Sequence, residues 1–124
     1  MEKVNGTCHC GKVSWVASLP ILTVVQCHCQ NCRKLQGSDY SSWVVITEDK
    51  FEITSGENLL SLYQFSKCSQ KCFCSLCGTV VFGINGKHFS KHKLFSLGCV
   101  ANYCELLKPQ LQVYTEFRAP WCLE

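Results

Sequence analysis

The sequence predicts a mostly β fold of short antiparallel strands, organised around clusters of cysteines. Three observations support this prediction. Hydrophobic residues make up 47% and charged residues 17% of the 124 residues, so the chain is too apolar to be disordered and its length fits one domain, residues 1–124. Short β-branched, aromatic or alternating runs are separated by turn signals. Cysteine occurs 12 times, a density typical of either a disulfide scaffold or bound metal.

The expected strands follow from these runs, in chain order, because their side chains favour a pleated, half-buried surface. They are residues 13–16, 21–25, 42–46, 60–65, 79–82, 94–97 and 111–114. Turns are predicted where glycine, proline and asparagine gather, at residues 19–20, 36–39, 55–58, 84–87 and 108–109. One helical turn is predicted at residues 31–35.

The cysteine spacing favours metal over disulfides. The chain starts without the apolar region of a signal peptide, so we expect a cytoplasmic protein whose thiols stay reduced. No apolar run approaches the length of a membrane-spanning helix, and no membrane association is expected. Cysteines two or three residues apart make poor disulfides, because the bridge needs a particular separation and orientation of the two side chains. The same spacing suits metal ligands.

Four of the cysteines are predicted to form a closed structural zinc site. Cys8 and Cys10 lie two residues apart, and on an extended segment both sulfurs would point to one face. Cys74 and Cys77 flank a tight turn that Gly78 can complete with a positive φ. Two pairs give the four thiolates of a tetrahedral zinc site.

A second cluster, Cys27, Cys29 and Cys32, offers three ligands, which is the pattern of a reactive zinc with one further position for water or substrate. The alternative is a second closed site with a fourth ligand from elsewhere. His28 is a poor candidate because it alternates away from its neighbours. The remaining candidates are Cys68, Cys72, Cys99, Cys104, His88 and His92. For these cysteines and Cys122, the simpler interpretation is a small buried thiol.

The charge balance argues against a nucleic-acid partner. The formal net charge is +3, but a zinc with four thiolates carries −2 and one with three carries −1, so the metal-loaded protein lies near 3 − 3 = 0. The basic segment 87–93 follows an Asn-Gly turn and is interpreted as a solvated loop.

Several motifs together resemble one known family. They are Gly6-Thr-Cys-His-Cys-Gly11, Cys27-His-Cys-Gln-Asn-Cys-Arg-Lys34 with Gly37, Phe73-Cys-Ser-Leu-Cys-Gly-Thr79 and Pro120-Trp121. In this order they resemble the glutathione-dependent formaldehyde-activating enzymes, whose domain is shared with centromere protein V.

The resemblance implies an Mss4-like, or β-tent, fold that binds two zinc ions. It implies that Cys8, Cys10, Cys74 and Cys77 hold a structural zinc, and that Cys27, Cys29 and Cys32 hold a second, labile, catalytic zinc. It also implies an activity: glutathione and formaldehyde combine to S-hydroxymethylglutathione, and in the reverse direction the enzyme is a carbon–sulfur lyase.

The chemistry is physically consistent with these residues. A zinc that already has three thiolate ligands is a weak Lewis acid, so capture of a substrate thiol is favoured over activation of the carbonyl. Arg33 and Lys34 directly follow the cluster and are candidates for binding a substrate carboxylate. A local hydrogen bond is the alternative for Arg33.

Two further questions stay open at this level. The alternative function is a non-catalytic, zinc-stabilised binding or adaptor module. The sequence sets neither the true thiol and carbonyl substrates nor the oligomeric state.

The aromatic residues Trp15, Trp43, Phe82 and Trp121 are candidates for a pocket wall, with burial in the core as the simpler expectation.

Overall fold

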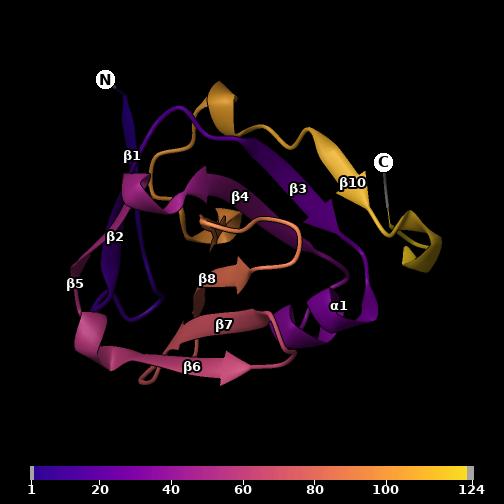
Figure 1. The fold of residues 1–124 in the computed structure, drawn as a ribbon, viewed down its shortest axis with the longest axis horizontal. Coiled ribbons are helices and arrows are strands. Elements are labelled where there is room, and N and C mark those ends of the chain that lie inside the picture. The colour runs from indigo at the N-terminus through magenta and orange to yellow at the C-terminus, as the bar shows by residue number, and fades with distance from the viewer. Residues whose placement is uncertain (1, 123–124) are drawn as a thin grey trace.

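The computed structural model describes residues 2–122, which form ten strands, one α-helix and five 3-10 turns (Figure 1). The strands are β1 (Lys3–Thr7), β2 (Ser14–Ser18), β3 (Thr23–Cys27), β4 (Ser41–Thr47), β5 (Phe51–Ser55), β6 (Leu60–Gln64), β7 (Ser69–Cys74), β8 (Val80–Asn85), β9 (His92–Ser96) and β10 (Leu111–Val113). The helix is α1 (Gln30–Gln36), and the 3-10 turns are η1 (Glu48–Lys50), η2 (Glu57–Leu59), η3 (Leu97–Cys99), η4 (Glu105–Leu107) and η5 (Thr115–Phe117). The prediction of a mostly β fold is confirmed.

The strands form two sheets. The smaller has the order β1-β2-β5, and the larger has the order β10-β3-β4-β9-β8-β7-β6. Neighbouring strands are antiparallel, except that β10 runs parallel to β3. This parallel pair was not expected from the sequence, because it depends on where the long connection after β9 returns to the sheet.

Both sheets share one hydrophobic core. At its centre four aromatic rings pack together: Trp15 of β2, Phe51 of β5, Phe82 of β8 and Phe95 of β9, with ring centroids 4.5 to 5.6 Å apart. Pairs at this separation stabilise a fold beyond the burial of their area. The same rings therefore hold the small sheet against the large one.

The structure differs from the sequence-based expectation at three strands and one turn. Strands β1, β5 and β7 were not predicted, because their sequences are largely polar or contain glycine and cysteine. The segment from Cys8 to Cys10 was expected to be extended, and this was wrong. It forms a turn after β1, in which the Gly11 N–H donates to the Cys8 carbonyl at 3.1 Å. The two cysteines converge because the chain bends, not because a strand alternates.

Within residues 2–122, no helix has both the length and the apolar character needed to cross a bilayer.

A glycine in β1 allows this strand to pack closely against η3 and the Trp15 ring. A Cβ atom at Gly6 would overlap the Cys99 carbonyl oxygen and the Trp15 ring. We expect Gly6→Ala to lower the free energy of unfolding by about 1–3 kcal/mol or more, because backbone and a buried ring must shift. Urea denaturation measures this.

The matched control is Gly98→Ala, since a Cβ there meets no atom within 4 Å. Its stability should change by less than about 0.5 kcal/mol. Equal losses in the two variants would contradict the close packing of β1.

Candidate functional site

Four cysteine sulfurs from two distant turns meet at one point. Cys8 and Cys10 lie in the turn after β1, Cys74 ends β7, and Cys77 lies in the turn before β8. All four Sγ atoms lie within 4.8 Å of one another, with Cys8–Cys10 at 3.5 Å and Cys10–Cys74 at 3.9 Å. A tetrahedron with Zn–S bonds of about 2.3 Å needs sulfurs about 3.8 Å apart. The group therefore fits a zinc ion, and we call it the four-cysteine group.

The backbone around this group explains its geometry. Gly78 has a φ of 81°, and its N–H donates to the Cys74 carbonyl at 2.8 Å, which closes the turn between Cys74 and Cys77. The Thr79 hydroxyl lies 3.3 Å from the Cys77 sulfur and accepts the His9 N–H at 3.0 Å, so it links the two turns.

Hydrogen bonds also favour the thiolate form that zinc requires. The Thr79 hydroxyl, followed by the Thr79 and Cys10 backbone N–H groups, lowers the pKa of Cys77 to about 5. For Cys8, burial opposes ionisation, but the Val13 N–H at 3.4 Å from its sulfur helps to hold the pKa below its ordinary value. Cys10 is the exception: the Lys12 backbone favours its thiolate, but its contacts with Cys8, Cys77 and Cys74 raise its pKa to about 11.

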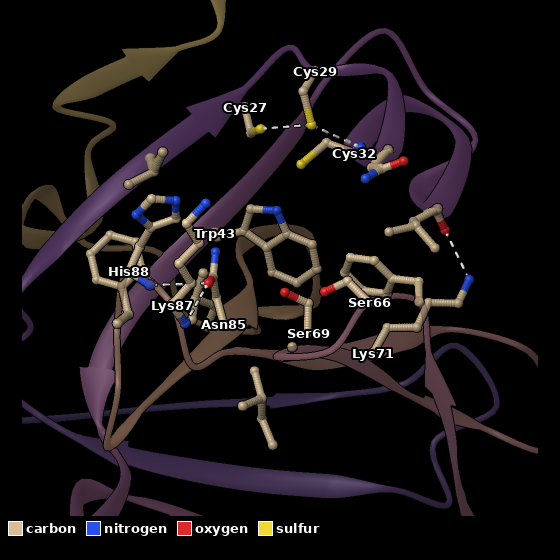
Figure 2. A pocket seen from close by; sticks show the side chains of 18 of the residues that line it. Cys27, Cys29, Cys32, Trp43, Ser66, Ser69, Lys71, Asn85, Lys87 and His88 are labelled. Atoms are coloured by element: carbon tan, nitrogen blue, oxygen red, sulfur yellow. Dashed lines mark hydrogen bonds between the residues drawn. The ribbon is translucent and has the colours of Figure 1, made fainter.

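The second cluster forms where β3 meets α1. Cys27 ends β3, Cys29 is the N-cap of α1, and Cys32 lies in its first turn (Figure 2). Their three Sγ atoms lie within 4.8 Å of one another, and those of Cys27 and Cys29 are 3.5 Å apart. The Cys32 N–H donates to the Cys29 sulfur at 3.4 Å, so the capping interaction also fixes a ligand. These residues are the three-cysteine group, and their spacing again fits a zinc ion.

The contact between the Cys27 and Cys32 side chains shifts the pKa values of the two thiols in opposite directions. The side chain of Cys27 is the largest influence on Cys32, and with the Ser41 hydroxyl it lowers the pKa of Cys32 to about 6 although burial opposes this. The same contact, together with burial, raises the pKa of Cys27. The group therefore carries a thiolate near neutral pH.

The two groups differ in their surroundings. A cavity of about 980 Å³ borders the three-cysteine group and includes all three of its residues in its lining, but none of the four-cysteine group. Its walls come from α1, strands β3, β4, β8, β9 and β10, the β6–β7 hairpin, the β8–β9 loop and η5. Among residues 2–122 no further histidine, cysteine, aspartate or glutamate joins the three sulfurs.

The candidates for a fourth ligand are spread through the fold. Cys68 and His88 line the same cavity, although neither belongs to the three-cysteine group. Cys72 belongs to the shared core of the two sheets, and Cys99 and Cys104 pack against it. His92 lies on β9, and its Nδ1 is 2.8 Å from the Ser90 carbonyl oxygen. Cys122 follows the C-terminal turn, where its N–H donates to the Ala119 carbonyl at 3.0 Å.

Arg33 and Lys34 lie on α1, but neither is among the residues that line the cavity. The basic residues of the lining are instead three lysines and a histidine from the β6–β7 hairpin, β7 and the β8–β9 loop: Lys67, Lys71, Lys87 and His88. The sequence analysis named His88 only as a candidate fourth metal ligand, and it missed the three lysines because no local motif links them to the cysteines. The basic composition of residues 87–93 was the one available signal.

Of the aromatic residues named as candidates for a pocket wall, only some line the cavity. Trp43 lines the cavity, whereas Trp15 and Phe82 lie in the shared core. Trp121 is 72% exposed and donates to Asp39 at 3.0 Å. His28 is 1% exposed, and its Nε2 lies 3.0 Å from the Gln112 side-chain oxygen, on β10.

A family model described as "Glutathione-dependent formaldehyde-activating enzyme" matches residues 3–117. The chain belongs to this family. A Talaromyces marneffei protein named "Putative glutathione-dependent formaldehyde-activating enzyme" is 32% identical over 78 residues. That alignment covers 61% of this chain and 42% of the relative, so the chain matches less than half of the relative's length. A crystal structure of a Rhodobacter sphaeroides protein has a similar fold, with a TM-score of 0.69 at 21% identity, covering 87% of this chain and 98% of that one.

The two cysteine groups should respond differently to mutation. Cys74 is fully buried and joins distant turns. Cys74→Ser should therefore lower the free energy of unfolding by several kcal/mol. The upper limit is the apparent binding free energy of a structural zinc, about 10–16 kcal/mol. Cys29→Ser, at the cavity, should keep the fold. Melting curves and zinc content measure both effects, and equal melting losses would contradict the division.

Thiol alkylation tests the assignment of the isolated cysteines. Burial raises the pKa of Cys72 to about 11 and that of Cys99 to about 11, whereas Cys68 is exposed. Iodoacetamide at pH 8 should therefore modify Cys68 at least about tenfold faster than the other two, because only the thiolate reacts. Peptide mass spectrometry follows each site, and comparable rates would be inconsistent with the burial.

Proposed function

We propose that the chain is a zinc-dependent enzyme that joins a thiol, such as glutathione, to formaldehyde or another small aldehyde. The reverse reaction is that of a carbon–sulfur lyase. The observation that carries this proposal is the three-cysteine group, whose ligands border a cavity of about 980 Å³. Ligand pockets usually measure about 300–1,000 Å³, so the space suits a tripeptide-sized thiol. The family description and the name of the Talaromyces relative support the same chemistry.

Two zinc ions per chain are part of this proposal. Cys8, Cys10, Cys74 and Cys77 would hold the structural ion within one unit spanning residues 1–124. Cys27, Cys29 and Cys32 would hold the second ion, which supplies a position where an incoming thiol binds as its thiolate at neutral pH.

The residues of the cavity would position the substrate and exclude water from the reacting sulfur. The thiol sulfur and the carbonyl carbon form the new bond, while the thiol proton ends on the carbonyl oxygen. Trp43 is 9% exposed and packs against the three-cysteine group, so it excludes water beside the reacting sulfur. Lys87 and His88 lie exposed on the cavity lining, where they would bind substrate carboxylates.

Zinc analysis tests whether the second site accepts a thiol. We expect two zinc ions per chain, falling to about one after incubation with glutathione and desalting, with the fold retained. Cys29→Ser is the matched control and should start near one and stay there. Two ions that remain in place would favour two closed sites and the adaptor function.

Product formation tests the catalysis itself. Carbon-13 NMR of labelled formaldehyde measures the rate of S-hydroxymethyl formation above the uncatalysed rate. Cys32→Ser should lower that excess by about 100-fold or more, since loss of an outer-shell partner alone typically costs 10–100-fold at a metal site. An unchanged rate would contradict a role for the three-cysteine group.

A further inference from the structure

The short helix that carries two of the three cysteines has little packing of its own. Helix α1 has seven residues, and none of them is buried. A helix this short is marginal in water, so its stability depends on contacts with the rest of the fold. Cys29 is its N-cap and Cys32 lies in its first turn, and the position of the helix therefore decides where two of the three sulfurs lie.

Each end of α1 has its own contact with the large sheet. At the first turn, the Cys32 side chain interacts with the Ser41 hydroxyl of β4. At the other end, the Leu35 carbonyl is one of the last four of the helix, which have no partner within it. The Nζ of Lys71, on β7, donates to this carbonyl oxygen at 3.1 Å. The C-terminal end of α1 is thus held by a lysine 36 positions away in the sequence.

Lys71 is well placed to hold that end of the helix. It pairs with Tyr63 of β6 and with Gly83 of β8, so its backbone is fixed on both sides. Its Nζ lies 5.6 Å from the centroid of the Phe73 ring, within the range of a cation–π attraction. A cation is also favoured at the C-terminal end of a helix dipole. Figure 2 shows the Lys71 side chain reaching from its strand toward α1.

Strand β7 contacts both cysteine groups. Phe73 packs against the cluster that contains Cys27 and Trp43, beside the three-cysteine group. Cys74, the next residue, belongs to the four-cysteine group and is fully buried. Lys71 and Phe73 are two residues apart on the strand, so their side chains leave it on the same face. Lys71 therefore ties α1 to a strand that the core holds firmly.

We propose that Lys71 is a positioning residue for the three-cysteine site, which keeps the Cys29 and Cys32 sulfurs at the spacing that retains an ion by holding α1 against β7. Without its ammonium group the Leu35 carbonyl loses its partner, and the helix end moves together with both ligands. This inference rests on the proposed function in one respect, namely that the three-cysteine group binds zinc. Its test is metal retention, which does not require turnover.

Zinc release to an excess of a chromogenic chelator measures this role. Lys71→Met keeps an unbranched side chain but removes the donor. It should release the zinc of the three-cysteine group about tenfold faster than the wild type, the lower end of the 10–100-fold that loss of an outer-shell partner costs in metal affinity. Lys71→Arg retains a donor and should release zinc close to the wild-type rate. An unchanged rate in Lys71→Met would overturn the inference.

Lys67→Met is the matched control for charge. Lys67 is exposed and lines the same cavity, whereas the donor to α1 is Lys71. Lys67→Met should therefore release zinc at the wild-type rate. Equal acceleration in Lys67→Met and Lys71→Met would mean that loss of a positive charge near the thiolates is the cause, and the positioning role would be wrong.

A second background assigns the effect to one of the two sites. In Cys29→Ser, the zinc of the four-cysteine group is expected to remain. Adding Lys71→Met to this variant should leave the release of that ion unchanged, because the contact with α1 no longer serves a bound metal. Faster loss of that ion would show that Lys71 supports the fold in general, which contradicts a specific role at the three-cysteine site.

Cobalt(II) in place of zinc supplies a spectroscopic readout of ligand geometry. The visible bands of cobalt bound by thiolates depend on the angles between the ligands. Lys71→Met should shift the bands of the cobalt in the three-cysteine group, and Lys71→Arg should restore them. Identical spectra in the wild type and Lys71→Met would contradict a change in the positions of the sulfurs.

The failure of this inference is distinguishable from failure of the proposed function. Product formation from glutathione and formaldehyde is measured separately. If the wild type gives no product while Lys71→Met releases zinc faster, the proposed function is contradicted and the inference stands. If the wild type gives product and the release rates are equal, the function stands and the inference is overturned. A wild-type chain that holds a single zinc would overturn the inference, whatever its turnover.

Discussion

The fold depends on the convergence of four sulfurs from two sheets. Cys8 and Cys10 lie in the connection between strands of the small sheet, whereas Cys74 and Cys77 lie in the connection between two strands of the large sheet. An ion bound there would close a loop of 64 residues between Cys10 and Cys74. In the chain-entropy model, a cross-link of that length stabilises the fold by about 4 kcal/mol. Cys8 and Cys74 are already buried in the shared core, and the Thr79 hydroxyl joins the two turns, so an ion there would reinforce contacts that the fold already makes.

Strands β7 and β8 connect this constraint to the cavity. At one end of the pair lie Cys74 and Val80, next to the four-cysteine group. At the other end Ser69 pairs with Asn85, and both residues line the cavity. The two strands are antiparallel neighbours over this whole length. Rigid strands anchored at one end therefore position the polar edge of the cavity at the other.

Strand β4 connects the shared core to the cavity beside the three-cysteine group. Trp43 pairs in register with Val25 of β3, two residues before the three-cysteine group begins. On the next two positions Val44 and Val45 are fully buried. One strand thus supplies both the shared core and the apolar wall of the cavity. The stability of the fold and the shape of the site are built from the same residues.

Much of this protein follows from local sequence. Cysteines two or three residues apart form turns or caps that bring their sulfurs together, so the two groups, with Cys27 and Cys74 among them, were predictable from spacing. Alternating β-branched runs likewise predicted seven of the strands. Strands β1, β5 and β7 were not predictable, because polar segments become strands only where a neighbouring strand needs a hydrogen-bonding partner.

Tertiary structure alone decided what surrounds the three-cysteine group. Arg33 and Lys34 are adjacent to Cys32 in sequence, yet the cavity takes its lysines from Lys67, Lys71 and, in the β8–β9 loop, Lys87, all more than thirty positions away. Only the pairing of β3 with β4, of β4 with β9 and of β9 with β8 brings that loop opposite the cysteines. The distance between cysteines two or three residues apart is set locally, by the backbone of one turn or helix cap. The substrate-facing wall depends on strand order, which is set by the burial of side chains throughout the core.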